Sequence, residues 1–163
     1  MTDLPKLIVF DLDFTLWSAG GLWIDCTAWP FNERDGKIFD AEEREFKLYP
    51  DIEPIVQQLQ EDGCLLGIAS RTSEPGWARW VLDIWELREQ FDFEEIYPGS
   101  KITHFEALRD KSEIEFEEML FFDDEQRNID EVGNLGVCSV LVENGVTRSR
   151  FEHGVNLWRK SKN

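Results

Sequence analysis

The stretch IVFDLDFTLW, residues 8–17, places two aspartates directly after a short apolar run. The run itself, LIVF at positions 7–10, is rich in residues that favour β-structure, which predicts a buried strand. Asp11 and Asp13 follow at the carboxyl end of that strand, and Thr15 stands two residues further on. Carboxylates at the edge of a hydrophobic core need a partner that offsets their charge. We therefore expect a functional site where this strand ends.

Composition excludes several classes of function. The 163 residues suffice for a substantial core, and no Gly/Ser-rich linker divides them, so we expect a single domain over residues 1–163. Lys and Arg number 17 against 34 Asp and Glu, which gives a net charge of −17. Such a surface repels nucleic acid and anionic lipid. We accordingly expect no nucleic-acid partner, no membrane partner and a monomer.

The chain also lacks signals for membrane insertion, secretion or cysteine chemistry. Its longest apolar runs are only a few residues long, so no segment can cross a bilayer, and the first ten residues lack a signal-peptide pattern. Cys26, Cys64 and Cys138 are odd in number and show no metal-ligand spacing, which favours structural thiols. These features predict a reduced, cytoplasmic protein.

Strand-like runs alternate with helical patterns over the second two thirds of the chain. The segment 18–49 is irregular, and its apolar fragments at 23–24 and 38–39 suit a small hairpin. Alternating strands and helices are typical of an α/β fold, in which helices cover both faces of a parallel sheet. We expect helices over 51–63, 74–90, 102–109 and 128–134, and strands over 64–70, 93–97, 118–124 and 137–142.

Polar side chains follow three of the expected strands at the point where each strand ends. Asp11 and Asp13 follow the first, the SRT stretch at 70–72 follows another, and Asp123 and Asp124 follow a third. Parallel strands end at the same edge of a sheet, and ligands bind outside those carboxyl ends. Three strand ends that deliver polar groups to one edge predict a single site.

The four aspartates of this edge would repel one another. A like-charged pair ~4 Å apart costs roughly 4 kcal/mol at an effective dielectric constant of about 20, and each charge raises the pKa of the other. A divalent cation removes the conflict. Mg²⁺ prefers a few oxygen ligands with water and a substrate phosphate, whereas Ca²⁺ takes more ligands and zinc prefers His or Cys. We therefore expect Mg²⁺ as the cofactor.

The other polar residues of this edge suit a phosphate group. Ser70 and Thr72 offer hydroxyl and backbone N–H donors where a loop leads into a helix. Lys101 brings positive charge that, together with Mg²⁺, would offset the charge of a transferring phosphoryl group. Arg71 has two interpretations: it contacts a phosphate-bearing group, or it pairs with the acidic surface.

Four motifs in this order resemble those of the haloacid dehalogenase superfamily of phosphotransferases: FDLDFT, SRT, the isolated Lys101 and FFDD. The longer stretches PKLIVFDLDFTLW, YPGSKITHFEAL and FFDDEQRNI resemble its small eukaryotic magnesium-dependent phosphatases, of the acid phosphatase type. The resemblance runs over nearly the whole chain. It implies a Rossmann-like, three-layer α/β/α fold and hydrolysis of phosphomonoesters through an aspartyl-phosphate intermediate.

The resemblance also implies a role for each motif residue. Asp11 matches the nucleophile that attacks phosphorus, and Asp13 matches the general acid that protonates the leaving group and then activates water. Ser70 matches the phosphate-binding hydroxyl, and Lys101 matches the lysine of the third motif. Arg71 stands beside Ser70 as a further phosphate-binding candidate.

The metal ligands follow from the same resemblance. Asp123 matches the magnesium ligand of the fourth motif. The other two protein ligands that the resemblance implies are the Asp11 carboxylate and the Asp13 backbone carbonyl. Asp124 is expected to support this site from behind the ligands, or else to cap a turn. Thr15, like Thr72, is expected to support its loop rather than to touch substrate.

Two other functions can use similar residues. A receiver-like phosphoacceptor module also combines an aspartate, an acid pair, Ser or Thr and Lys, but its acid pair precedes the acceptor strand, the reverse of the order here. Asp13 also argues against such a module, because a general acid-base group speeds loss of the phosphoryl group. A phosphomutase would keep the motifs but normally needs a cap that excludes water.

The motif spacing leaves no room for a separate cap domain. In the first gap only 18–49 is left over, and stable domains usually need roughly 50 residues or more. We call residues 18–49 the flap; some of Trp17, Trp23 and Trp29, in or beside it, can wall the substrate entrance. An open site admits phosphate on a bulky carrier, and the resemblance points to phosphotyrosine or protein-linked sugar phosphates.

Overall fold

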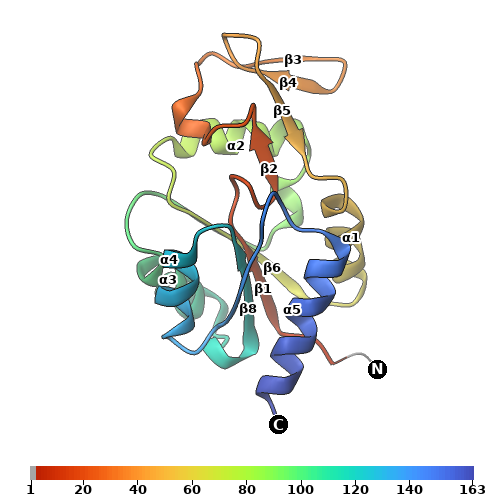
Figure 1. The fold of residues 1–163 in the computed structure, drawn as a ribbon, viewed down its shortest axis with the longest axis vertical. Coiled ribbons are helices and arrows are strands. Elements are labelled where there is room, and N and C mark those ends of the chain that lie inside the picture. Colours follow the sequence, from red (N-terminus) through yellow and green to blue (C-terminus); the bar gives the residue numbers. More distant parts are fainter. Residues whose placement is uncertain (1–2) are drawn as a thin grey trace.

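A sheet of five strands forms the centre of the molecule (Figure 1). The structure is a computed structural model that describes residues 3–163. The strands lie in the order β7-β6-β1-β8-β9, and all neighbouring pairs are parallel, which confirms the predicted α/β fold. The bounds are β1 Leu7–Phe10, β6 Leu65–Ser70, β7 Phe93–Ile96, β8 Met119–Asp123 and β9 Cys138–Leu141.

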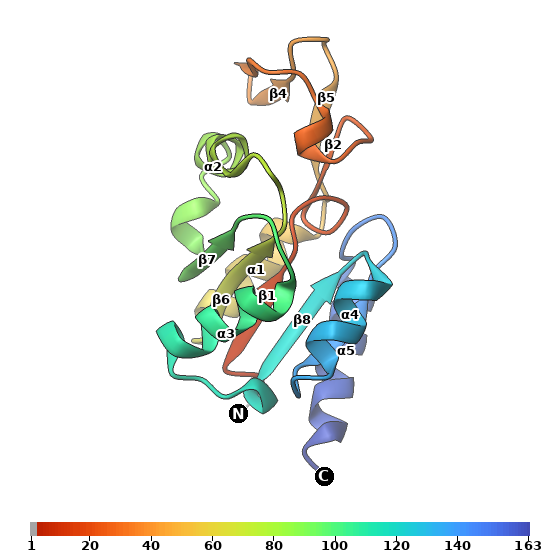
Figure 2. The same ribbon diagram turned by 90° about the vertical axis from the view of Figure 1, so that its left-hand side faces the viewer.

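Helices cover both faces of this sheet (Figure 2). Side chains alternate along β1, so that Ile8 and Phe10 pack toward α1, α2 and α5, while Leu7 and Val9 pack toward α3 and α4. None of the helices within residues 3–163 is long and apolar enough to cross a bilayer. The helices are α1 Ile52–Glu61, α2 Pro75–Ile84, α3 Lys101–Ser112, α4 Gln126–Gly133 and α5 Arg148–Ser161.

The C-terminal helix α5 is absent from the sequence-based prediction, which ended with the strand over 137–142. Its buried residues Phe151, Val155 and Trp158 recur at helical spacing, and the side chain of Thr147 caps its first turn. Both signals were present in the sequence and would have found the helix. The helix covers β8 and β9, so it completes one of the two outer layers.

The flap forms a second, antiparallel sheet in the order β2-β5-β4-β3. Only its β3–β4 part is the hairpin expected around 38–39. Asp35 and Gly36, at the turn of that hairpin, both have positive φ, as a type I′ turn requires. Residues 23–24 instead lie at the 3₁₀-helix η1, Ile24–Cys26. The strands are β2 Trp17–Ala19, β3 Asn32–Arg34, β4 Lys37–Phe39 and β5 Glu45–Leu48.

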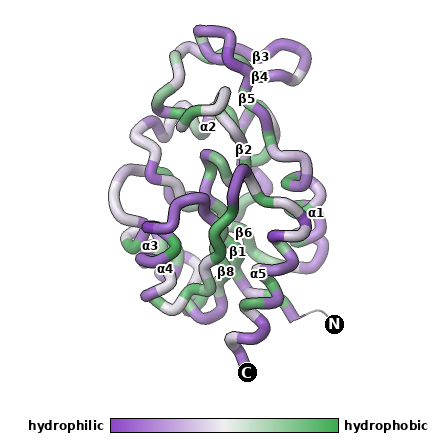
Figure 3. The backbone as a smooth tube through the Cα atoms, in the orientation of Figure 1, coloured by the Kyte–Doolittle hydropathy of each residue, from purple (hydrophilic) through white to green (hydrophobic). Residues whose placement is uncertain are grey.

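The flap shares the core of the main sheet. Ile38 and Phe46 of the flap belong to the same buried cluster as Ile8 and Phe10 of β1. Figure 3 shows hydrophobic residues concentrated along the central strands, while the outer turns of the flap are hydrophilic. The flap therefore shares its buried side chains with the cluster on one face of the main sheet.

The strand order predicts a ligand site at the carboxyl ends of the strands. The chain runs from β1 outward through β6 to β7, then crosses to β8 and β9 on the other side of β1. The order thus reverses between β1 and β8, and such switch points hold the ligands of open α/β sheets at the carboxyl ends of the strands. In Figure 2 these ends face the flap.

The close packing of helix α5 against strand β8 can be tested by substitution of a glycine in that helix. A Cβ added at Gly154 would stand 2.7 Å from the ring of Phe122 in β8. We expect Gly154→Ala to lower the free energy of unfolding by about 1–3 kcal/mol, because the helix must shift away from the sheet. In α4, nothing lies within 4 Å of a Cβ added at Gly133, so Gly133→Ala should be neutral or stabilise by up to about 1 kcal/mol. Equal urea midpoints for the two variants would contradict the docking of α5.

Candidate active site

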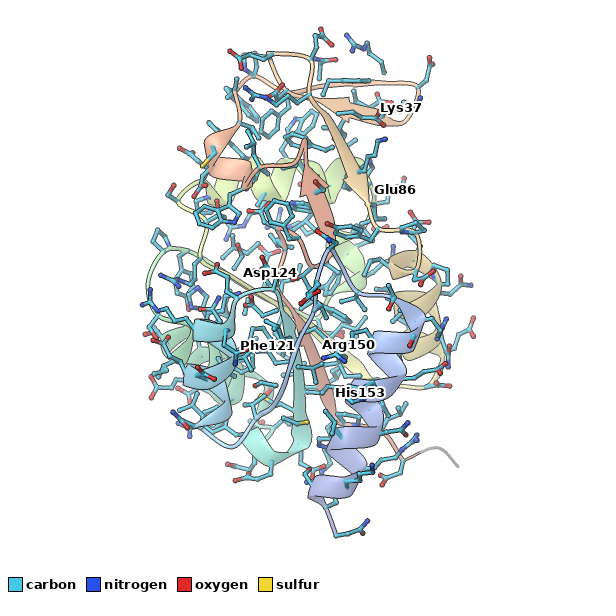
Figure 4. The ribbon with its side chains drawn as sticks, in the orientation of Figure 1. Lys37, Glu86, Phe121, Asp124, Arg150 and His153 are labelled. Atoms are coloured by element: carbon cyan, nitrogen blue, oxygen red, sulfur yellow. The ribbon has the colours of Figure 1, made fainter. Side chains whose placement is uncertain are left out.

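A cavity of about 330 Å³ opens at the carboxyl ends of the strands, beside the flap. The predicted site residues meet here, although they come from separate strands and loops. Asp123 and Thr15, both fully buried, lie behind the cavity wall. Figure 4 shows Asp124 between the end of β8 and the flap. The predicted residues that line the cavity are Asp11, Asp13, Ser70, Arg71, Thr72, Lys101 and Asp124.

Lys101 joins two of the carboxylates at the base of the cavity. It is the first residue of α3 and is only 1% exposed. Its Nζ lies 2.8 Å from Asp11 Oδ1 and 2.5 Å from Asp123 Oδ2. Burial alone would lower the pKa of Lys101, but the two carboxylates raise it above its usual value, so the ammonium stays charged. One cation thus links β1, β8 and the start of α3.

Three carboxylates are close enough to share a cation. Asp11, Asp123 and Asp124 each offer an oxygen, and these oxygens lie within 4.8 Å of one another. Burial, together with the negative charge of Asp11, raises the pKa values of Asp123 and Asp124. Lys101 offsets only part of this charge. A hard divalent cation with oxygen ligands therefore fits the residues present.

Asp124 lies in the same cluster as the expected ligands Asp11 and Asp123. Its expected role, in support of the ligands or in a turn cap, stays a prediction. The Asp123 carboxylate also accepts hydrogen bonds from Glu125 N at 2.8 Å and from Asn128 Nδ2 at 3.0 Å, which fixes its orientation. Asp13, expected to contribute its backbone carbonyl, turns its carboxylate away from this cluster toward the flap.

Asp13 lies in a different environment from Asp11. Its Oδ1 accepts a hydrogen bond from Trp17 Nε1 at 2.9 Å, and its Oδ2 accepts one from Ile24 N at 3.0 Å. Burial and the nearby charge of Asp11 outweigh these bonds and raise the pKa of Asp13 to about 7. Asp11 is instead in an ion pair with Lys101 and accepts a hydrogen bond from Thr15 Oγ1 at 3.2 Å. Neighbouring carboxylates with different surroundings can divide nucleophilic and acid-base roles.

The loop after β6 forms the opposite wall of the cavity. Ser70 Oγ accepts a hydrogen bond from Thr72 N at 3.2 Å, which tightens the turn. Arg71 donates from Nη1 to Asn128 Oδ1 at 3.3 Å, and its buried Nε has no partner within residues 3–163. Arg71 lines the cavity, and no ion pair of its guanidinium is present in the part of the chain that the structure describes.

Two buried residues of the site had no role in the sequence analysis. Asn128 bridges Asp123 and Arg71, and its place five residues after Asp123 in the FFDDEQRNI stretch was a usable signal. The ring nitrogens of His104 lie within 3.0 Å of three backbone carbonyl oxygens, and these contacts tie together the ends of β6 and β7 and the start of α3. The three carbonyl oxygens belong to Ser70, Tyr97 and Ser100.

The three tryptophans in or beside the flap lie in different places. Only Trp23 lines the cavity, where it is 52% exposed. Trp17 is fully buried, so it cannot wall an entrance. Trp29 stacks on Trp77 of α2 with ring centroids 5.6 Å apart, which attaches the flap to that helix. The expected aromatic wall is thus reduced to one side chain.

Residues 3–161 match the family described as Acid Phosphatase. The chain belongs to the acid phosphatase family. It is 42% identical to human "Magnesium-dependent phosphatase 1" over 164 residues, an alignment that covers 99% of this chain and 92% of the human protein. It is 38% identical to a HAD-like hydrolase superfamily protein of Schizosaccharomyces pombe, with coverage of 83% and 84%.

Solved structures show the same fold. A haloacid dehalogenase-like family protein from Streptococcus pneumoniae superposes with a TM-score of 0.63 at 14% identity, over 91% of this chain and 90% of that chain. The predicted resemblance is therefore confirmed: the protein is a magnesium-dependent phosphatase of the haloacid dehalogenase type. The cluster of three carboxylates agrees with Mg²⁺ as its cofactor.

Metal binding should release protons. In the metal-free protein burial and the negative charge of Asp11 raise the pKa of Asp124 to about 9, which favours its protonated form near neutral pH, and a metal ligand must be ionised. The affinity for Mg²⁺ should therefore fall as the pH falls from 8 to 6, by up to ~10-fold per pH unit for each carboxyl that must lose a proton. Calorimetric titration in two buffers of different ionisation enthalpy measures the protons released. Asp124→Asn should release fewer, and a pH-independent affinity would contradict this account of the cluster.

Proposed function

We propose that this phosphatase hydrolyses phosphomonoesters through a phosphorylated Asp11. The observation that carries the proposal is the contrast between Asp11 and Asp13, which line one cavity in different environments. Asp11 lies in an ion pair with Lys101, as suits a carboxylate nucleophile, while Asp13 has its pKa raised to about 7, as suits a general acid and base. Ser70, Arg71 and Lys101 would hold the phosphoryl oxygens.

In the first step an Asp11 oxygen attacks phosphorus and the bond from phosphorus to the ester oxygen breaks. Asp13 gives its proton to that leaving oxygen, so the alcohol departs neutral and Asp13 is left ionised. In the second step Asp13 takes a proton from water, whose oxygen attacks phosphorus. Inorganic phosphate leaves, and the Asp11 carboxylate is restored with Asp13 protonated.

The residues that fit Mg²⁺ are Asp11, Asp123 and Asp124, together with the Asp13 backbone carbonyl that the resemblance implies. When bound, Mg²⁺ would offset negative charge on the phosphoryl oxygens. Lys101 supplies a fixed positive charge for the same purpose from within the protein. Asn128 keeps Asp123 and Arg71 in a constant relative position during both steps.

The two first-motif aspartates should respond differently to substitution. Asp11→Asn should abolish phosphoenzyme formation, because an amide oxygen is a poor nucleophile. Asp13→Asn should still bind phosphate but should lose roughly 10²- to 10⁴-fold in turnover, the usual contribution of general acid-base catalysis. Mass spectrometry of a beryllofluoride or phosphoryl adduct locates the modified residue. An adduct on any residue other than Asp11 would refute the assignment.

We also propose that the phosphate is carried on a bulky group, namely phosphotyrosine or a sugar phosphate linked to protein. Two observations support an open site. The flap is attached to α2 through Trp29 and Trp77, and the one tryptophan on the cavity, Trp23, is itself half exposed. A large carrier can then remain outside while its phosphate enters.

Relative rates on small and large substrates test this choice. We expect higher kcat/KM for phosphotyrosine peptides or protein-linked sugar phosphates than for free hexose phosphates and nucleotides. If a free metabolite were preferred by more than about 100-fold, equivalent to roughly 2.7 kcal/mol of transition-state discrimination, the open-site proposal would be wrong.

We propose, finally, a monomer that acts in the cytoplasm. The net charge of −17 opposes self-association. Cys26, Cys64 and Cys138 are all free thiols, and the buried Cys64 donates to the backbone carbonyl of Pro5, which suits a structural thiol in a reducing compartment.

A further inference from the structure

The carboxylate of Asp13 is held from the flap and not from the main sheet. Both of its oxygens accept a hydrogen bond: Oδ1 from the indole N–H of Trp17 and Oδ2 from the backbone N–H of Ile24. Trp17 begins β2, and Ile24 begins η1, so both donors belong to the base of the flap. Two donors on two oxygens fix both side-chain torsions of an aspartate.

The indole of Trp17 is itself held by packing and by the backbone around it. The side chain is fully buried, and its ring packs edge-on against Trp85 with centroids 6.0 Å apart. Its backbone pairs with Leu48 of β5, and its carbonyl accepts a hydrogen bond from Phe14 N at 2.7 Å. The N–H that points at Asp13 therefore has a fixed position relative to the strand that carries Asp11.

We propose that Trp17 is a positioning residue for the acid-base step: its indole N–H holds Asp13 in the orientation that delivers a proton to the leaving oxygen. The inference rests on the proposed role of Asp13. The indole keeps its own proton throughout, and the proton that moves is the one on the Asp13 carboxyl, which passes to the ester oxygen as the ester bond to phosphorus breaks. The flap thus contributes to catalysis by orienting the acid, even though it does not close over the cavity.

A pair of esters separates this role from a general loss of structure. A dinitrophenyl leaving group departs as a stable anion and needs no proton, whereas a phenyl leaving group needs one. The ratio kcat/KM reports only the steps up to formation of the phosphoenzyme, so it isolates the proton donation. Trp17→Phe keeps an aromatic ring and removes the donor. We expect it to lower kcat/KM for phenyl phosphate by about 10- to 100-fold and for dinitrophenyl phosphate by less than about 3-fold.

Trp85→Phe is the matched control, because Trp85 packs on the same indole, whereas the hydrogen bonds to the Asp13 carboxylate come from Trp17 and Ile24. It should change both esters by the same small factor. If Trp17→Phe does not fold, replacement of Trp17 by benzothienylalanine keeps the bicyclic shape and removes only the N–H, and the same contrast between esters is expected. An equal effect on both esters, or none on either, would overturn the proposal.

Asp13→Asn in the same assay distinguishes a failure of the acid role of Asp13 from a failure of the positioning role of Trp17. If Asp13→Asn fails to discriminate between the esters, the acid role of Asp13 is wrong. If Asp13→Asn discriminates but Trp17→Phe does not, only the role of Trp17 is wrong. In the double variant the Trp17 substitution should add no further loss on phenyl phosphate, because it acts through Asp13.

Discussion

The buried ammonium of Lys101, held between Asp11 and Asp123, is the interaction on which the rest of the site depends. A buried charge is tolerated only when it is paired and hydrogen-bonded, so this one cation requires β1, β8 and the start of α3 to converge within bonding distance. The neighbouring contacts serve the same arrangement. His104 ties the first turn of α3 to the ends of β6 and β7, and Asn128 orients the second carboxylate.

The charge balance of this cluster accounts for the cofactor. Lys101 compensates part of the negative charge of three neighbouring carboxylates, while burial and the charge of Asp11 raise the pKa values of Asp123 and Asp124. A bound metal ion would offset the negative charge of these carboxylates and that of an incoming substrate phosphate together. The flap orients the Asp13 carboxylate away from this cluster, and burial together with the nearby charge of Asp11 raises its pKa to about 7, so Asp13 can exchange a proton near neutral pH.

Local sequence patterns were sufficient for the main sheet and for the residues at its edge. The strands that carry the site, β1, β6 and β8, are short apolar runs with a polar residue at or directly after their last position, so Asp11, Ser70 and Asp123 could be placed at one edge without any knowledge of packing. Of the antiparallel flap sheet only the β3–β4 hairpin was expected; the rest was beyond reach, because its strands are three or four residues long and are defined by pairing across gaps such as Trp17 with Leu48. Side-chain direction was equally hidden: only packing shows that Trp17 turns inward to Asp13 and that Asp124 joins the carboxylate cluster.

The thermal stability of Lys101→Met with and without Mg²⁺ tests the central role of this ion pair most directly. Removing the ammonium should lower the stability of the metal-free protein by about 3–5 kcal/mol, because the carboxylates lose their buried partner. Added Mg²⁺ should then raise the melting temperature of the variant by more than it raises that of the unchanged protein, since the cation replaces part of the missing charge. An equal or smaller rise in the variant would contradict the account.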